Sequence, residues 1–233
     1  MAKADEPTVR GSAVKGSNRD FAALSTNVRS HLHAHLAEST YKLRAKSDVQ
    51  DKAIGAMLLV FHAYEAKMTR IPTLVTERIL LRPMVADDWG PYSALMLSDR
   101  SRYMGGPFSK AAAWGMFCAD HAQWDLFGAG ALMLEEQSTG MCIGQIGINS
   151  GPLFPEQEIG WLVFPEAEGR GYAFEAASAL LDWAKHVKRL DTLVSYVDPQ
   201  NERSCRLAER LGAALDRNAP RPDPTDLVYR HFA

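Results

Sequence analysis

The chain has 233 residues, of which 46% are hydrophobic and 23% are charged, and its formal net charge at pH 7 is −2. These values are ordinary for a soluble globular protein, so they exclude a wholly disordered chain, a fibrous repeat and a strongly basic nucleic-acid-binding protein. The three cysteines (Cys118, Cys142 and Cys205) are scattered and lack a metal-ligand spacing, so we expect reduced thiols and no metal site.

Residues 1–67 form a predicted N-terminal extension. Residues 1–20 are rich in charge, glycine and serine without apolar periodicity, which predicts disorder. Beyond Ser47, apolar residues that include Ile54, Met57 and Phe61 recur at helical spacing, so the extension should be partly disordered with one or two helices. Two roles stay open: an appendage to the domain that follows, or a dimerisation element that makes the protein a homodimer.

The sequence carries no sign of a membrane partner. The longest apolar run, residues 56–61, is far shorter than the roughly twenty residues that span a bilayer. The first thirty residues also lack an apolar signal core, so we expect a cytoplasmic protein.

Residues 68–233 form the second predicted unit, in which strands and helices mix. Alternating or continuous apolar runs predict strands at 76–82, 129–135, 141–149, 158–164, 193–197 and 226–231. Helical periodicity predicts helices at 87–97, 110–126, after Gly171 and at 201–211. Turn residues join the strands between 129 and 164, which predicts an antiparallel meander. The expected fold is α+β, with a mixed, mostly antiparallel central sheet flanked by helices.

A glycine loop lies between the strand at 158–164 and the long helix after it. Gly169 and Gly171 can take backbone angles closed to other residues and leave no side chain to block a ligand. The helix that follows begins with N–H groups that have no partner within the helix, and its dipole is positive at that end. Such an end binds phosphate, so the loop predicts a site for a phosphorylated cofactor.

The segment Glu-Gly-Arg-Gly-Tyr-Ala at 168–173, followed by a strand and by Asn-Glu-Arg-Ser at 201–204, resembles the GNAT N-acetyltransferases from about residue 72 to the C-terminus. The segments 74–83, 158–161 and 208–212 are most similar to the branch that includes the ribosomal-protein alanine acetyltransferases. The resemblance implies acetyl-CoA as co-substrate and a GNAT-like sheet.

The resemblance also implies which residues bind that co-substrate. The backbone of Trp161, Leu162 and Val163 should pair with the pantetheine arm, because the strand splays from its neighbour there, and one of its N–H groups should polarise the thioester carbonyl. The family pattern Gln/Arg-x-x-Gly-x-Gly/Ala falls on residues 168–173, and Asn201 should bond the cofactor arm. The remaining cofactor-binding residues are Glu168, Gly169, Arg170, Gly171, Tyr172 and Ala173.

Two positions qualify this implication. Glu168 departs from the family pattern, and a carboxylate near phosphate should weaken the affinity for the cofactor without abolishing it. The guanidinium of Arg170 could offset that charge by reaching pyrophosphate oxygens, and the alternative is a solvated loop residue.

Two residues are the catalytic candidates. Ser204 would protonate the departing thiolate, as the family implies for a Ser or Tyr at this place. Glu158 would take the proton of an ammonium substrate, directly or through water, if burial raises its pKa towards neutrality. We rate Cys205 as a core residue, because direct attack by the amine needs no acyl-cysteine.

The predicted reaction is acetyl transfer to a primary amine, either a protein or peptide N-terminus or a small molecule. Residues 1–67 carry ten basic and seven acidic side chains and the rest carry sixteen and twenty-one, so the domain mildly favours a cationic acceptor. The residues of loop 98–108 that we expect near the acceptor are Asp99 and Tyr103. The alternative is a non-catalytic acyl-CoA-binding or regulatory module on the same fold, which Glu168 and the lack of a tyrosine beside Ser204 keep open.

Overall fold

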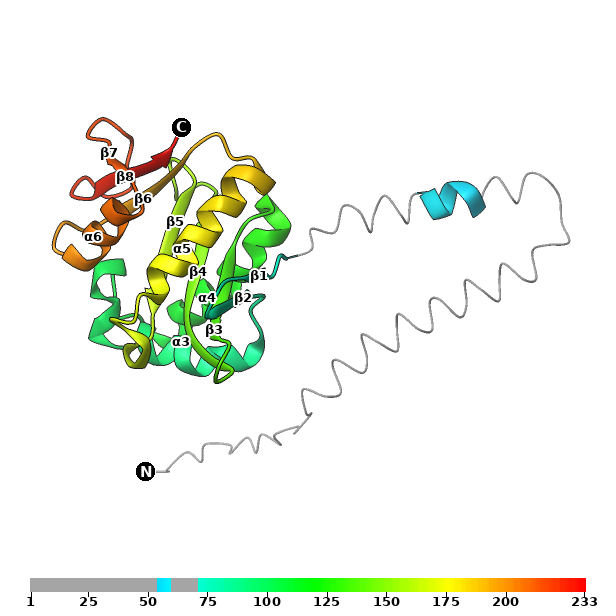
Figure 1. Cartoon of the computed structure of the whole chain (residues 1–233), viewed down its shortest axis with the longest axis horizontal. Coiled ribbons are helices and arrows are strands. Elements are labelled where there is room, and N and C mark those ends of the chain that lie inside the picture. Colours follow the sequence, from blue (N-terminus) through cyan, green and yellow to red (C-terminus); the bar gives the residue numbers. More distant parts are fainter. Residues whose placement is uncertain (1–53, 60–70) are drawn as a thin grey trace, which may run out of the picture. The chain divides into compact units, whose positions relative to one another are not determined.

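The structure is a computed structural model that describes residues 54–59 and 71–233 (Figure 1). The chain divides into two units, Met1–Ala66 and Lys67–Ala233. In the first unit, residues 54–59 are helical, within the stretch where the sequence predicts a helix. The other expectations for the extension, including its disorder, lie outside the described residues.

The second unit is built on one eight-stranded sheet with the order β1-β2-β3-β4-β5-β6-β8-β7. Only β5 and β6 run parallel, and every other neighbouring pair is antiparallel. The strands are β1 (Leu74–Val75), β2 (Ile79–Arg82), β3 (Ala131–Glu136), β4 (Met141–Asn149), β5 (Glu158–Val163), β6 (Leu193–Val197), β7 (Ala214–Leu215) and β8 (Leu227–Phe232). The predicted mixed, mostly antiparallel sheet and its central meander are therefore confirmed.

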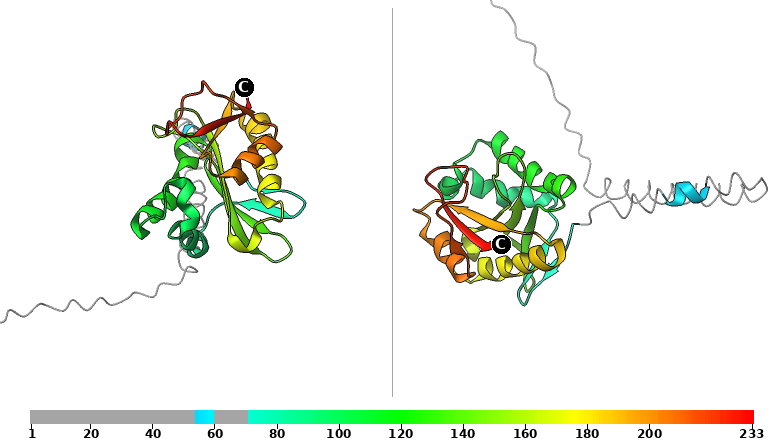
Figure 2. Two further views of the ribbon diagram at one scale, coloured as in Figure 1. Left: turned by 90° about the vertical axis from the view of Figure 1, so that its left-hand side faces the viewer. Right: turned by 90° about the horizontal axis from the view of Figure 1, so that it is seen from above.

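Helices cover both faces of the sheet (Figure 2). The helices are α3 (Trp89–Met96), α4 (Lys110–Phe127), α5 (Tyr172–Trp183) and α6 (Glu202–Arg210), with short helical turns η1 (Ala86–Asp88), η2 (Asp99–Met104), η3 (Pro165–Ala167) and η4 (Ala184–Lys188). One core cluster packs α5 on the strands through residues such as Ala177, Leu180 and Ile146. A second cluster packs α3 and α4 on the other face through Tyr92, Phe117 and Met133.

Local signals in the sequence explain where the helices begin and end. The Ser109 hydroxyl accepts a hydrogen bond from the Ala112 amide at 3.2 Å and so caps α4, which ends at Gly128 with a φ of +66°. The Asn201 side chain caps α6 by accepting from the Ser204 amide at 3.3 Å. No side chain caps the start of α5, so its first amides keep their hydrogen-bonding capacity.

Two strand predictions differ from the structure. The predicted strand at 76–82 starts too early, because the Thr76 amide donates to the Ile79 carbonyl at 2.9 Å and residues 76–78 form the turn before β2, while the two-residue strand β1 before that turn is missing from the sequence prediction. The two-residue strand β7 is missing from the sequence prediction, since it is defined only by its pairing with β8. Loop 98–108 contains the helical turn η2, with Ser98 as its cap.

The parallel strands β5 and β6 touch only at one end. Their register has a single pair, Glu158 with Val194, and the Val194 amide adds a hydrogen bond to the Gln157 carbonyl at 3.1 Å. The Ser195 hydroxyl then donates to the Ile159 carbonyl at 2.8 Å. Beyond that point the two strands part, and the edge of β5 that faces β6 has no strand partner.

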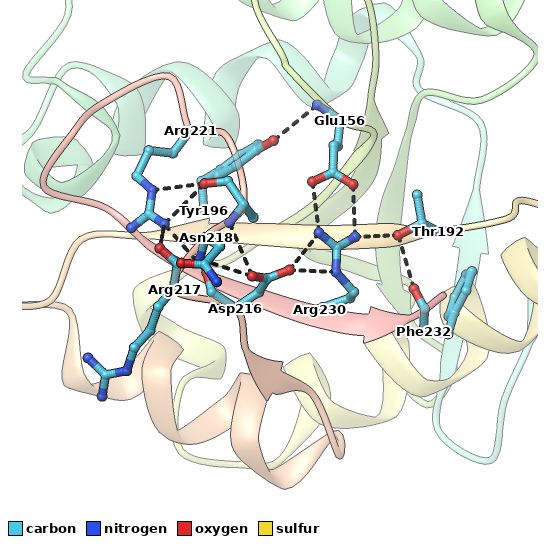
Figure 3. Close-up of polar contacts among 10 residues, drawn as sticks. Glu156, Thr192, Tyr196, Asp216, Arg217, Asn218, Arg221, Arg230 and Phe232 are labelled. Carbon is cyan, nitrogen blue, oxygen red and sulfur yellow. Dashed lines mark hydrogen bonds and ion pairs between the residues drawn. The ribbon is translucent and has the colours of Figure 1, made fainter.

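A polar clamp holds the joined end of these strands (Figure 3). The Arg230 guanidinium on β8 binds both carboxylate oxygens of Glu156 at 2.8 and 2.9 Å, and it also reaches Asp216 and the Thr192 hydroxyl. The Tyr196 hydroxyl accepts from the Glu156 amide at 3.1 Å. The clamp therefore ties the segment just before β5 to β6 and β8, and it fixes where the strands separate.

Among the described residues, no helix is long and apolar enough to cross a membrane.

Candidate functional site

A groove of about 970 Å³ opens where β5 and β6 part. Its walls come from α3 and η2 on one side, from α6 on another, and from the glycine loop with the start of α5. Ten of the twelve predicted site residues line it: Trp161, Leu162, Val163, Glu168, Gly169, Gly171, Tyr172, Ala173, Asn201 and Ser204. The other two, Glu158 and Arg170, lie outside its lining.

The glycine loop has the backbone geometry that its sequence indicates. Gly169 and Gly171 have φ values of +74° and +84°, in the left-handed region that favours glycine. A Cβ atom added to Gly169 would have no atom within 4 Å, so the main chain there is open to the groove side. Because α5 begins at Tyr172 without a side-chain cap, the loop presents free amides at a positive helix end.

The side chains of Arg78, Glu136, Arg170 and Tyr172 form a brace that holds the glycine loop; Glu136, Arg78 and Arg170 do not line the groove. Glu136, only 6% exposed at the end of β3, accepts a hydrogen bond from the Tyr172 hydroxyl and pairs with Arg170 at 2.8 Å. Arg78 donates to the Arg170 carbonyl at 3.0 Å and pairs with Glu175. The guanidinium groups of Arg78 and Arg170 lie over the Tyr172 ring at 4.8 and 4.9 Å.

This brace changes the expectation for Arg170. Its guanidinium is ion-paired with Glu136, in a separate pocket lined also by Glu77, Arg78 and Gln137, so in this structure it does not extend into the groove. The side chain is half-exposed and helps to position the loop, and its contact with a cofactor stays a prediction.

The carboxylate of Glu168 is neutralised by neighbouring side chains. It pairs with Arg100 of η2 on one oxygen and with Arg203 of α6 at 2.7 Å on the other. The sequence analysis expects the Glu168 carboxylate to repel phosphate and weaken the affinity for the cofactor. That expectation assumes an unpaired carboxylate, and in this structure the carboxylate is paired. Both arginines lie far from Glu168 in the sequence, and no local signal pairs them with it.

Ser204 lies within hydrogen-bonding distance of the splayed strand. Its hydroxyl oxygen accepts from the Trp161 indole N–H at 3.3 Å, which leaves the hydroxyl proton free for another acceptor. The Trp161 ring also meets the His231 ring edge to face at 6.4 Å. Burial lowers the pKa of His231 to about 4, so the imidazole is neutral, and it contacts the Ser195 hydroxyl at 3.0 Å. Cys205 packs in the small core beneath α6, as the sequence indicates.

Glu158 lies at the start of β5, on the face of the sheet that α4 covers. Burial raises the pKa of its carboxyl to about 7, and the Asn149 side-chain amide donates to it at 3.0 Å. Asn149 in turn accepts from Gln123 of α4 at 3.2 Å. A carboxyl with this pKa can accept a proton near neutral pH. Leu162, on the same face of β5, lines the groove.

Sequence reasoning missed a second desolvated carboxyl, that of Asp120 on α4. The Tyr92 hydroxyl donates to it at 3.3 Å, and burial raises its pKa to about 6. A signal was present in the sequence, because Asp120 follows Phe117 by three residues and precedes Trp124 by four, which places it on the apolar face of the helix. Of the two expected acceptor-side residues in loop 98–108, Tyr103 lines the groove and Asp99 does not.

The described residues contain no group of three or more histidine, cysteine, aspartate or glutamate side chains placed to hold a metal ion.

Comparisons with known proteins agree with this arrangement. The family model described as an acetyltransferase (GNAT) domain matches residues 78–214. The protein YkkB of Bacillus subtilis (strain 168) is 30% identical over 165 residues, which cover 67% of this chain and 93% of YkkB.

Solved structures share the fold. The crystal structure of an acetyltransferase from Agrobacterium tumefaciens str. C58 is 57% identical, with a TM-score of 0.69 over 70% of this chain and 96% of that chain. The ribosomal-protein-S5-alanine acetyltransferase from Vibrio fischeri is 15% identical, with a TM-score of 0.51 over 69% of this chain and 94% of that chain. At that identity the likeness shows the fold alone.

Proposed function

Because this chain belongs to the GNAT acetyltransferase family, we propose that it transfers an acetyl group from acetyl-CoA to a primary amine by direct attack of the amine on the thioester. The observation that carries the proposal is the unpaired edge of β5, which lies beside a glycine loop and an uncapped helix end in one groove. The edge supplies backbone groups for an amide-bearing arm, and the loop supplies amides for phosphate.

The residues of the groove fit acetyl-CoA as the co-substrate. We assign the phosphates to the amides of Gly169, Gly171 and the first turn of α5, and the pantetheine arm to the edge of β5 at residues 161–163. Five arginines and two glutamates line the same groove, so its lining keeps a positive charge after Arg100 and Arg203 pair with Glu168, and that charge complements the negative ligand. When bound, acetyl-CoA supplies an activated acyl group.

The chain's own residues then handle protons and charge. Glu158 takes a proton from the acceptor ammonium, so that the neutral amine can form the new N–C bond while the C–S bond breaks. A backbone N–H of residues 161–163 stabilises the oxyanion, a contribution of about 3 kcal/mol for one such donor. Ser204, whose oxygen is engaged by Trp161, turns its proton toward the departing thiolate and is replenished by the amine's second proton.

We also propose that the reaction takes place in the cytoplasm. The three cysteines are free, which suits a reducing compartment.

The test is a thiol-release assay with acetyl-CoA and a panel of small amines and N-terminal peptides. The proposal expects release of free CoA that depends on an amine, together with an acetylated product identified by mass spectrometry. Tight CoA binding without transfer to any acceptor would instead support the non-catalytic acyl-CoA-binding module.

A further inference from the structure

The two glutamates that line the groove are paired in different ways. Glu202 pairs with Arg206 at 3.0 Å, four residues further along the same helix. Glu168 lies in the glycine loop and pairs with arginines from two other elements, Arg100 of η2 on one oxygen and Arg203 of α6 on the other. All three members of this second group line the groove, so the Glu168 carboxylate joins three parts of its lining that are far apart in the sequence.

The other arginines of the groove have partners outside the glycine loop. Arg102 donates to the Tyr103 hydroxyl at 3.1 Å, and the Arg210 guanidinium lies over the Phe174 ring at 3.9 Å. Arg206 has its partner on its own helix. Among the described residues that line the groove, the two arginines paired with Glu168 are therefore the ones held at the loop.

Glu168 engages only part of each guanidinium. The contact with Arg100 uses its Nη2 atom, and the contact with Arg203 uses its Nη1 atom. A guanidinium carries five N–H donors, so each of the two can bond a second anion while it stays paired with Glu168. The side chains of Arg100 and Arg203 are 41% and 76% exposed, so a second anion can reach them from solvent.

The pairing holds both guanidinium groups next to the amides that we assign to phosphate, because Glu168 directly precedes Gly169. Two arginines and one carboxylate give the group a net charge of +1, so as a whole it attracts a phosphate although one member is acidic. A long side chain that becomes ordered only when a ligand binds loses conformational entropy at that moment. Arginines that Glu168 already holds have lost that freedom before the ligand arrives.

We propose that Glu168 is a positioning residue that holds Arg100 and Arg203 for the pyrophosphate of CoA, so that this carboxylate strengthens CoA binding instead of weakening it. This inference rests on the proposed function, which assigns the phosphates to the glycine loop. The pyrophosphate oxygens accept hydrogen bonds from the loop amides and from the remaining guanidinium nitrogens, and Glu168 stays paired with both arginines.

The test compares the two groove glutamates by calorimetry of CoA binding. Glu168→Gln should raise the Kd for CoA about tenfold, or about 1.4 kcal/mol, because a neutral amide cannot hold two guanidinium groups by charge. Glu202→Gln removes the same charge from the same groove and is the matched control, with a Kd within about threefold of the native value. An equal or lower Kd in Glu168→Gln would overturn the inference, because the carboxylate would then act by repulsion.

Shorter ligands identify the part of CoA that the arginines bind. Dephospho-CoA keeps the pyrophosphate and lacks the 3′-phosphate, and pantetheine lacks both. Glu168→Gln should raise the Kd for dephospho-CoA about as much as that for CoA and change the Kd for pantetheine by less than about twofold. A loss confined to CoA would place the arginines at the 3′-phosphate, and an equal loss with pantetheine would indicate a distorted groove. Either result would contradict the proposal.

A combined variant shows whether Glu168 acts through the arginines. In a protein that carries Arg100→Gln and Arg203→Gln, only the repulsion between the Glu168 carboxylate and phosphate remains. Adding Glu168→Gln to that protein should therefore lower the Kd for CoA or leave it unchanged. A further rise of about tenfold would show that Glu168 does not act through these arginines.

These binding measurements need no acetyl transfer, so they separate this inference from the proposed function. A protein that loses CoA affinity in Glu168→Gln, and whose native form transfers acetyl to no amine, would overturn the proposed reaction and keep the role of Glu168. Transfer by the native protein, with an unchanged Kd for CoA in Glu168→Gln, would do the reverse.

Discussion

Glu158 combines a raised pKa, an orienting amide and a place at the end where β5 and β6 are joined. Its folded pKa of about 7 lies above the ordinary value of 4.5 because burial disfavours the charged form. A base must be unprotonated to act, so kcat/KM for an amine should fall about tenfold per pH unit below pH 7. Glu158→Gln should lower kcat about a hundredfold or more and remove that limb from the pH profile measured by thiol release.

The raised pKa of Glu158 also predicts how the free energy of unfolding depends on pH. A carboxyl with a raised folded pKa stabilises the fold fully below its unfolded pKa, and this stabilisation is lost as the pH rises through about 7. Glu158→Gln should therefore be more stable to urea than the native chain at pH 8, with no such gain at pH 4. A gain of equal size at both pH values would contradict the assigned pKa shift.

A substitution at Glu136 should affect binding rather than catalysis, because Glu136 contacts the glycine loop and does not line the groove. Glu136→Gln removes the charge that pairs with Arg170 and weakens the acceptor for Tyr172. The loop should lose its fixed conformation, and the Kd for CoA, measured by calorimetry, should rise about tenfold with kcat at saturation nearly unchanged. Glu166→Gln, an exposed change one turn before the loop, is the control. An unchanged Kd in Glu136→Gln would show that Glu136 does not hold the glycine loop in the conformation that binds CoA.

At the scale of residues, the sequence predicted which residues lie at the groove better than it predicted which ion pairs their side chains form. The glycine loop could be recognised at Gly169 and Gly171 because backbone freedom is a local property, and the family resemblance added Asn201; all three line one groove. Sequence reasoning did not anticipate that Arg170 would turn to Glu136, nor that Arg100 and Arg203 would meet Glu168. Those pairs join residues from different elements, and only the folded chain brings them together.

At the scale of elements, the loop and the helix it precedes act together. Gly171→Ala forces an alanine into a φ of +84° and places its Cβ 3.5 Å from an Arg78 nitrogen. The strain of about 1 kcal/mol or more should distort the amides at the start of α5 and raise the Kd for CoA about tenfold. Gly140→Ala is the matched control, because Gly140 has a φ of +69° with no atom near its added Cβ, in the turn between β3 and β4. It should cost similar stability and leave CoA binding intact.

Predictions of the elements succeeded where the local pattern decides. The bounds of β4 and β6 agree with the predicted 141–149 and 193–197, since apolar runs and turn residues mark both ends. The predicted strand at 76–82 included the turn before β2 and left out β1, because Thr76 turns the chain through hydrogen bonds that no apolar pattern reveals. The strand β7 exists only through its pairing with β8. The splay of β5 from β6 was expected from the family resemblance. Hydrophobic periodicity alone gives no sign that the two strands separate.

At the scale of the whole molecule, the boundary near Met68 is a proposal that can be tested directly. A chain that begins at Met68 should fold and bind CoA with a Kd within about threefold of the full chain, because every described residue that lines the groove comes after that point. Analytical ultracentrifugation of both chains tests the alternative role of the extension. If the full chain is a dimer and the shorter chain a monomer, residues 1–67 are a dimerisation element and not an appendage.

The clamp of Arg230 on Glu156 has a consequence for how such a groove can change. The strands β5 and β6 are joined at one end only, so the angle between them is set by residues that never touch the contents of the groove. A substitution in the clamp would alter how β5 diverges from β6 while every described side chain that lines the groove stays the same. The opening of the groove beside β5 is therefore a quantity that residues outside its lining can adjust.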